Sequence, residues 1–252
     1  MLWSKAIGAG GALGGGGGTL FGPRGVFGVG FSGVTVNTID YITIATTGNA
    51  IDFGDLTVTR SYAAATSDGS RGVFGGGSGN IATIDYITIS TPGNAIDFGD
   101  LTVGRNALAA TSDGSRGVFG GGVGGTNIID YITIATTGNA IDFGDLTVGR
   151  VELAATSDGS RGVFGGGSST NIIDYITIAT TGNATDFGDL TLARIGLAAT
   201  SDGSRGVFGG GRDASSTYLN TIDYIPIATT GNATDFGDLT LARGFFSATS
   251  GG

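Results

Sequence analysis

The residues of this chain that could do chemistry occur at fixed, repeated spacings. Asp142 and Asp145 are placed like a general acid and a general base, but the same pair returns in all five repeats of the sequence. Catalysis requires a unique and asymmetric constellation, which five equivalent copies do not provide. Each repeat also lacks the dense oxygen ligands that calcium requires. We therefore interpret these aspartates as strand and turn residues, and we expect no catalytic residues, no metal site and no cofactor.

One arginine recurs at an equivalent position of each repeat. As a ring near one face, these guanidinium groups could grip an anionic ligand. Repeated arginines more often pair with neighbouring aspartates through charge-assisted hydrogen bonds, which would lock adjacent units together. We favour the lock and keep the anionic ligand as the alternative. The set comprises Arg60, Arg105, Arg150, Arg194 and Arg243.

Composition narrows the classes of partner. The chain has 12 Lys and Arg against 21 Asp and Glu, a net charge of −9, so we expect no nucleic-acid partner. Neither His nor Cys is present, which excludes disulfides and the usual zinc ligands. No apolar run reaches the roughly 20 residues of a membrane helix. The start of the chain is a poor signal peptide, because Lys5 follows the first apolar residues.

An internal repeat positions these side chains. The motif Arg-Gly-Val-Phe-Gly begins at Arg24, Arg71, Arg116, Arg161 and Arg205, in steps of 44 to 47 residues (205−161 and 71−24). A fixed period in this range indicates a repeat architecture. The 52 glycines stand at fixed places between alternating apolar runs, so we interpret them as turn and close-packing positions.

Each repeat carries four strand signals. In one copy these are Arg116–Gly120, the β-branched run Ile129–Ala135, Ile141–Val148 and Leu153–Ser157. Asp-Gly and Gly-Asn pairs, which suit tight hairpin turns, separate several of them. Four short strands in a repeat of about 45 residues are typical of a β-propeller blade.

The repeat resembles the kelch repeat. The resemblance rests on the glycines that follow Val-Phe, on Ile173-Asp-Tyr-Ile-Thr-Ile, on Asp186-Phe-Gly-Asp-Leu and on the connecting Arg194. Phe187 and its copies stand where kelch repeats usually carry Trp. The resemblance covers residues 24–252 and implies an all-β fold, a five-bladed kelch-like β-propeller with four strands per blade. An open stack or solenoid of the same units is the alternative.

The ends of the repeat array predict how the ring closes. The chain enters at a second strand, Arg24–Gly28, and ends on a first strand, Phe245–Ser250, which matches Leu153–Ser157. We expect the C-terminal strand to complete blade one, which would remove exposed sheet edges. The predicted regions are a flexible Gly-rich N-terminal arm at 1–23 and the propeller at 24–252.

Differences between the repeats collect at one end of the predicted blades. The loops between second and third strands vary, as do the residues just after the connecting arginine. Alternating strand directions place both sets on one face, and kelch-family domains often bind partners there. Free drift of loop sequence is the alternative. The predicted ligand- or partner-binding face comprises Phe31, Tyr62, Asn106, Glu152, Arg212, Asp213, Tyr218 and Phe245.

Residues 173–191 resemble repeats found in structural proteins of tailed bacteriophages, marine ones especially. That resemblance implies a non-enzymatic virion protein, tail- or capsid-associated, for docking or host-surface adhesion. Its partners would be other virion proteins, bound through the N-terminal arm, and a host-surface glycan or protein. A homo-oligomer stays open, and a frayed terminus is the alternative for the arm. The expected anchor residues are Leu2, Trp3 and Ile7.

A soluble sugar-binding lectin is the alternative function. One site in each blade would give avidity. Such sites need an aromatic platform in each variable loop, and only Phe31 and Tyr218 qualify. Repeated sites are therefore disfavoured, whereas a single site is not.

Overall fold

The computed structural model describes residues 24–124 and 126–249. The elements in these ranges are all β-strands, and none is an α-helix. No helix in these ranges is long and apolar enough to cross a membrane. Alternating β-branched and aromatic residues favour strands because they pack well on a pleated surface. The strands are β1 (Arg24–Phe31), β2 (Thr35–Thr43), β3 (Ile51–Asp55), β4 (Ala64–Ser67), β5 (Arg71–Gly75), β6 (Thr83–Thr88), β7 (Ile96–Asp100), β8 (Ala109–Ser112), β9 (Arg116–Gly120), β10 (Ile128–Thr133), β11 (Ile141–Asp145), β12 (Ala154–Ser157), β13 (Arg161–Gly165), β14 (Ile172–Thr177), β15 (Thr185–Asp189), β16 (Ala198–Ser201), β17 (Arg205–Gly209), β18 (Thr221–Pro226) and β19 (Thr234–Asp238).

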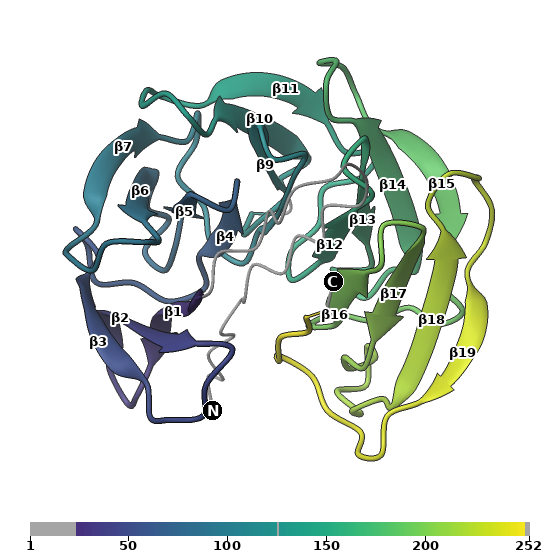
Figure 1. Ribbon diagram of the computed structural model, residues 1–252. Coiled ribbons are helices and arrows are strands. Elements are labelled where there is room, and N and C mark those ends of the chain that lie inside the picture. Colours follow the sequence, from purple (N-terminus) through teal and green to yellow (C-terminus); the bar gives the residue numbers. More distant parts are fainter. Residues whose placement is uncertain (1–23, 125, 250–252) are drawn as a thin grey trace.

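The strands form five antiparallel sheets, numbered one to five along the chain. Sheet one has three strands in the order β1-β2-β3. The other four sheets have four strands each, in the orders β4-β5-β6-β7, β8-β9-β10-β11, β12-β13-β14-β15 and β16-β17-β18-β19. Figure 1 shows the sheets succeeding one another around an arc, with sheets one and five at its two ends. The chain is therefore an all-β protein of repeated antiparallel sheets, compatible with a propeller-like repeat.

Short strands of small residues lie on the inside of this arc. The strands β4, β8, β12 and β16 all read Ala-Ala-Thr-Ser, and each contacts its equivalent in the next sheet. The hydroxyl of Ser112 donates to the carbonyl of Ser67 at 2.9 Å, and the hydroxyl of Ser157 donates to the carbonyl of Ser112 at 2.9 Å. The small side chains thus allow close approach, and the serines bond one sheet to the next.

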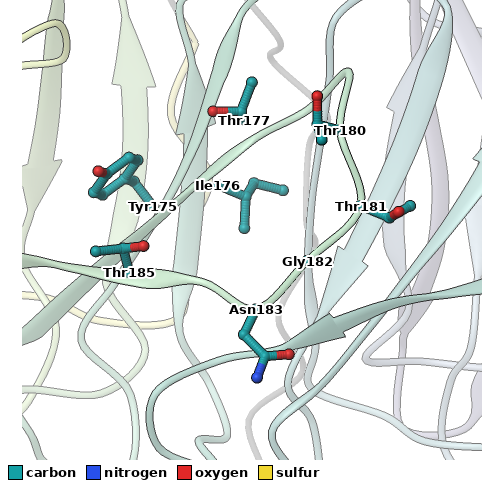
Figure 2. Close-up of a pocket in the computed structure, with 8 residues that line it drawn as sticks. All are labelled: Tyr175, Ile176, Thr177, Thr180, Thr181, Gly182, Asn183 and Thr185. Carbon is teal, nitrogen blue, oxygen red and sulfur yellow. The ribbon is translucent and has the colours of Figure 1, made fainter.

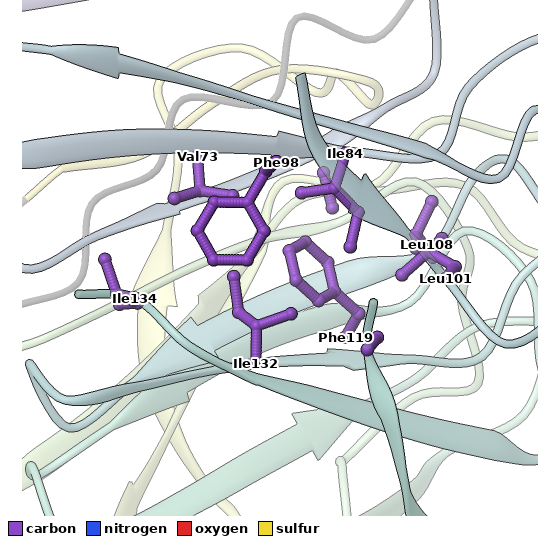
Figure 3. Close-up of a cluster of buried hydrophobic side chains, with 10 residues drawn as sticks. Val73, Ile84, Phe98, Leu101, Leu108, Phe119, Ile132 and Ile134 are labelled. Atoms are coloured by element: carbon purple, nitrogen blue, oxygen red, sulfur yellow. The ribbon is translucent and has the colours of Figure 1, made fainter. Parts of the chain in front are cut away.

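The hydrophobic core lies between neighbouring sheets. Figure 3 shows the cluster shared by sheets two and three, where Val73 and Phe98 of one sheet meet Phe119 and Ile132 of the other. Gly75 on β5 leaves room for the ring, because a Cβ there would lie 2.7 Å from Phe119 Cε1. The same glycine and phenylalanine contact recurs as Gly120 with Phe164 and Gly165 with Phe208.

Aspartates fix the turns between the first and second strands of the sheets. The Oδ1 atom of Asp113 accepts hydrogen bonds from the amides of Ser115 and Arg116, at 2.8 and 2.7 Å. Gly114, between Asp113 and Ser115, has φ +85°, a left-handed conformation that favours glycine. The amide of Ile134, just beyond β10, donates to the carbonyl of Ser115 at 2.9 Å. This turn, whose sequence hardly changes between the repeats, and the end of the third strand β10 therefore lie at the same end of the sheet.

Several predicted strand bounds were wrong. The strand β10 ends at Thr133 and not at Ala135, β1 continues beyond Gly28 to Phe31, and β12 begins at Ala154. The fourth strand β11 ends at Asp145 and not at Val148. The amide of Leu146 turns back to the carbonyl of Asn127 at 2.7 Å, and the next residue, Thr147, bonds to the following sheet. The segment after Asp145 is therefore already part of the connection between sheets.

The predicted closing strand is not among the strands of the described residues. Sheet one has three strands, and residues 244–249 belong to none. The C-terminal segment does begin like an inner strand, since Phe246 lies over Gly210 just as Leu153 lies over Gly121. Closure of blade one by this segment therefore stays a prediction, and the predicted arm at 1–23 lies outside the described residues.

Candidate binding face

The variable loops and the variable connections meet at one end of the sheets. The amide of Ser78 donates to the carbonyl of Ser61 at 2.7 Å, and the amide of Arg212 donates to the carbonyl of Ile195 at 2.9 Å. Both variable sets thus lie on one face, and its binding role stays a prediction. Equivalent bonds join Val123 to Asn106 and Ser168 to Val151, at 2.8 and 2.9 Å.

One residue in each connection adopts a left-handed backbone. In four of these five residues, the backbone amide donates to the carbonyl of the equivalent residue in the preceding connection, at 2.6 to 2.9 Å. A non-glycine residue in this conformation costs on the order of 1–3 kcal/mol and persists only where its surroundings fix it. These variable positions therefore stand on a rigid backbone. Tyr62, Glu152 and Phe245 are partly buried, whereas Ala107 is buried. These residues, termed the entry residues, are Tyr62, Ala107, Glu152, Gly196 and Phe245, with φ between +54° and +64°.

Two entry residues interact across the face. Burial in the first place, and the charge of Glu152 in the second, raise the pKa of the Tyr62 phenol. The two residues precede β4 and β12, so they enter from sheets two and four. The structure thus places an aromatic hydroxyl and a carboxylate within electrostatic reach of each other on this face.

The longest variable loop, residues 212–221, is braced by its own polar groups. The Oδ1 atom of Asp213 accepts hydrogen bonds from the amides of Ser215 and Thr217, both at 2.9 Å. The amide of Leu219 donates to the carbonyl of Gly211 at 2.9 Å, which closes the base of the loop. Asp213 therefore orders the loop and is not a freely offered contact.

Three other predicted face residues gather beside this loop. Arg212 forms an antiparallel bridge with Tyr218, and its guanidinium lies 5.1 Å from the ring centroid of Phe245. Tyr218 is 40% exposed, whereas Phe245 is partly buried. The last entry residue thus lies under the cation of Arg212, and Tyr218 stands opposite Arg212 in the backbone bridge.

The remaining predicted residues are more dispersed. The side-chain amide of Asn106 donates to Oδ1 of Asn80 at 2.9 Å and so ties a connection to the neighbouring loop. Phe31 ends β1 and is 44% exposed. The expected anchor residues Leu2, Trp3 and Ile7 lie outside the described residues.

Four of the five connecting arginines are buried locks between sheets. Arg105, which follows sheet two, pairs with Asp130 of β10 in sheet three at 2.9 Å, and both side chains are fully buried. The hydroxyl of Thr102, also from the connection, donates to the same carboxylate. Arg243 is exposed, with its guanidinium 5.1 Å from the ring centroid of Phe246. The lock recurs as Arg60–Asp85, Arg150–Asp174 and Arg194–Asp223, at 2.8, 2.5 and 2.6 Å.

Burial lowers the pKa of these four guanidinium groups, and the charges of their aspartates oppose that shift. Arginine nevertheless stays protonated at ordinary pH, so each lock is a charged pair. A buried guanidinium that already holds a carboxylate has no surface to offer an external anion. The lock interpretation accounts for the four, and the anionic-ligand alternative retains Arg243.

A shallow hollow of about 330 Å³ lies at the opposite end of sheet four, lined by Tyr175, Thr180 and Asn183 among others (Figure 2). Oδ1 of Asn183 accepts a hydrogen bond from the amide of Asp145 in sheet three, at 3.1 Å. Equivalent asparagines make this bond at the other sheet boundaries. The hollow is therefore a consequence of repeated sheet-to-sheet packing.

The paired aspartates lie on an outer strand of each sheet. Asp142 is exposed on β11, and Asp145 ends that strand with its carbonyl bonded to the amide of Ala184 in the next sheet, at 2.7 Å. Over the part of the chain that the structure describes, no three acidic side chains are grouped so as to hold a metal ion. Both positions are those of strand residues.

The sequence did not reveal the left-handed entry residues or the electrostatic interaction of Tyr62 with Glu152. One signal was present, because Gly196 stands at the entry position of its repeat and glycine commonly marks such a conformation. The sequence contained no comparable signal for the electrostatic interaction of Tyr62 with Glu152.

No protein-family model matches this chain, and no curated protein matches it significantly.

Proposed function

We propose that this protein is a non-enzymatic docking module, a five-bladed kelch-like propeller that presents one variable face to a partner. The entry residues carry this proposal, because five backbone positions share one conformation and are joined by four successive hydrogen bonds, while the residue type differs at all five. Variable side chains on a rigid scaffold are the usual arrangement of binding loops.

The other repeated polar groups support the proposal because they serve the framework. Arginines and aspartates such as Arg150 and Asp174 are buried against each other, and Asp158 holds a turn through the amides of Ser160 and Arg161. Conversely, Tyr62, Glu152 and the exposed Tyr218 differ from their counterparts in the other repeats. The chain thus varies where a partner could touch it.

The proposed setting is the virion of a tailed phage, on its tail or capsid. The support is the resemblance of residues 173–191 to repeats of phage structural proteins. In this setting residues 1–23 would anchor the ring to another virion protein, and the variable face would bind a host-surface glycan or protein. Closure of blade one by Phe245–Ser250 would complete the ring.

The test of this setting is to find the protein in purified particles. Density-gradient-purified virions would be analysed by mass spectrometry, and the chain would be located by immunogold labelling and cryo-EM. We expect a five-bladed disc on the tail or capsid, with residues 1–23 bound to a neighbouring protein. Recovery of the chain only in the soluble lysate would overturn the virion proposal.

The test of the face compares matched variants of the same particle. Glu152→Lys combined with Tyr218→Ala changes the variable face, whereas Thr181→Lys changes the opposite end of sheet four. We expect the first variant to reduce adsorption to host cells by at least about tenfold, as expected for central interface residues, and the second to leave it unchanged. Equal adsorption of both would remove the face from the proposal.

A single-site lectin is the second candidate, favoured by the aromatic and carboxylate groups that share this face. Tyr62 and Glu152 interact there, and Tyr218 is exposed on the variable loop of the fifth repeat. A glycan array probed with the isolated protein tests it. A glycan that binds the wild type and not the Glu152→Lys variant would support the lectin, and a chain confined to virions that binds no glycan would exclude it.

A further inference from the structure

The boundary between sheets four and five shows what neighbouring sheets exchange. Sheet five contributes the ring of Phe208, which lies over Gly165 of sheet four so closely that a Cβ there would be 2.6 Å from it. Sheet five also buries Ile227 completely, and the carbonyl of Ile227 accepts a hydrogen bond from Nη1 of Arg161 at 3.0 Å. Each partner thus brings a distinct half of the interface.

Polar groups complete the same boundary. The amide of Asp189 at the end of β15 donates to Oδ1 of Asn232 at 3.1 Å. Arg194, which leaves sheet four, is buried against Asp223 of sheet five. The equivalent hydrogen bond and ion pair are present at all four boundaries between neighbouring sheets.

Sheet one carries the same half of the interface that sheet five contributes at this boundary, but no neighbouring sheet covers it. Phe27 is the counterpart of Phe208 and is 57% exposed, whereas Phe208 is 0% exposed. Ile44 is the counterpart of Ile227 and is 64% exposed, against 0%. The polar counterparts, Asn49 for Asn232 and Asp40 for Asp223, are present as well.

Sheet five carries the complementary half. Phe236 is 55% exposed, whereas its counterpart Phe187 in sheet four is 2% exposed. A Cβ on Gly209 would meet nothing closer than 3.9 Å, so the site of the phenylalanine ring is vacant among the described residues. Arg243 is exposed where Arg194 is fully buried.

We infer that sheet five binds sheet one of the same chain through a fifth copy of this interface. Phe27 then covers Gly209, Asn49 accepts from the amide of Asp238, and Asp40 pairs with Arg243. The inference rests on the proposed ring and deepens it, because it assigns closure to a whole sheet face and not to one added strand.

The occupant is the same chain for two reasons. The four existing boundaries bend the sheets into an arc whose ends lie on either side of one opening (Figure 1). Two complementary faces on one chain also meet at a high effective concentration, which a second copy reaches only at high protein concentration. Charge favours the same pairing, because the exposed Arg243 is matched by Asp40.

Cysteine cross-linking tests the inference on the isolated full-length chain, which has no cysteine of its own. The test pair is Asn49→Cys with Asp238→Cys, treated with a short bismaleimide. The matched control is Asp189→Cys with Asn232→Cys, the same pair across the intact boundary of sheets four and five. We expect both pairs to give an internally bridged monomer, with faster migration on denaturing gels, in similar yield.

Two outcomes would overturn the inference. Covalent dimers and larger oligomers from the test pair would show that the face binds a second copy of the chain. Bridging of the control pair alone would show that sheet five does not bind sheet one. Neither outcome bears on whether the protein is part of a virion, because no partner is present in the assay.

Paired substitutions give an independent measurement. In a closed ring Phe236→Ala lowers the melting temperature by about as much as Phe187→Ala, since both rings are then buried. An open arc, in which Phe236 stays exposed, predicts a loss for Phe187→Ala alone, and that result would contradict the inference.

Discussion

Gly75 and the ring of Phe119 are in contact across the boundary between sheets two and three, and a Cβ on the glycine would lie 2.7 Å from Cε1 of the ring. Phe119 is fully buried, so it has little freedom to move aside. The same relationship holds at the next two boundaries, between Gly120 and Phe164 and between Gly165 and Phe208. This contact is the packing unit from which the arc is built.

Gly75→Ala should lower the free energy of unfolding by about 1–3 kcal/mol, because extra volume in a dense core displaces its neighbours. Equilibrium denaturation in urea measures the change. Phe119→Leu in the same chain removes part of the ring and should make the two effects clearly less than additive. Simple additivity would show that the two residues do not share this space.

Asp130→Ala should lower the free energy of unfolding by about 3–5 kcal/mol, because it leaves the buried guanidinium of Arg105 without its carboxylate. Asp142→Ala removes an exposed carboxylate from the same sheet and should change stability by no more than about 0.5 kcal/mol. Denaturation of both variants side by side is the measurement. Equal effects would mean that the lock does not hold the sheets together.

Thr156→Val should leave stability unchanged or raise it by up to about 1 kcal/mol. The Thr156 hydroxyl is buried without a hydrogen-bond partner in the described structure, and its methyl group packs against Gly206. Thr147→Val is the matched control, since that hydroxyl donates to Asp174 and its loss should cost about 1.5–3 kcal/mol. A similar cost for both variants would show that Thr156 does have a partner.

Glu152→Gln should move the pKa of Tyr62 back toward the ordinary value of a phenol without restoring it fully, because burial remains the larger cause of its rise. Titration of the tyrosine ring-carbon NMR signals measures the shift for each tyrosine. Asp158→Asn, at the opposite end of the sheets, serves as the control and should leave Tyr62 unchanged. An unaltered pKa in Glu152→Gln would separate the two side chains.

Asp202 should titrate below its ordinary pKa of 3.8, because its carboxylate accepts hydrogen bonds from the amides of Arg205 and Ser204. A carboxyl group with a depressed folded-state pKa contributes stability that is present above its unfolded pKa and is lost as the pH falls through the folded pKa. Asp202→Asn keeps an acceptor oxygen but cannot titrate, so its stability should fall less on acidification. A normal or raised pKa in a carboxyl NMR titration would refute this.

Much of the fold could be predicted because the same pattern of strand and turn residues occurs five times in the sequence. The alternation in Ile129–Ala135 and the Asp-Gly turn at Asp113 determine local structure. The turn is found at the predicted place, and the strand spans Ile128–Thr133. The end of β11 could not be predicted, because the residues after it turn to a partner in another sheet, as when the hydroxyl of Thr147 donates to Asp174. Local pattern thus locates the strands, whereas long-range partners decide their lengths.

The candidate site was predicted less completely. Comparison of the repeats identifies which positions vary, and strand direction places them at one end. Their backbone conformation depends on bonds between successive connections, such as the amide of Glu152 to the carbonyl of Ala107 at 2.9 Å. Arg105 and Asp130 were anticipated as a type of pair, but which aspartate each arginine binds follows from three-dimensional packing.

The glycine and phenylalanine contact also has a genetic consequence. Phe119 packs on Gly75 as Phe164 packs on Gly120, so each unit offers the same phenylalanine on one side and the same glycine on the other. Duplication, deletion or exchange of one unit, by recombination between the segments that encode these similar repeats, would yield a chain whose sheet boundaries still match. Surface positions such as Tyr62 and Glu152 can then be reshuffled as cassettes, so new recognition surfaces can arise by rearrangement as well as by point mutation.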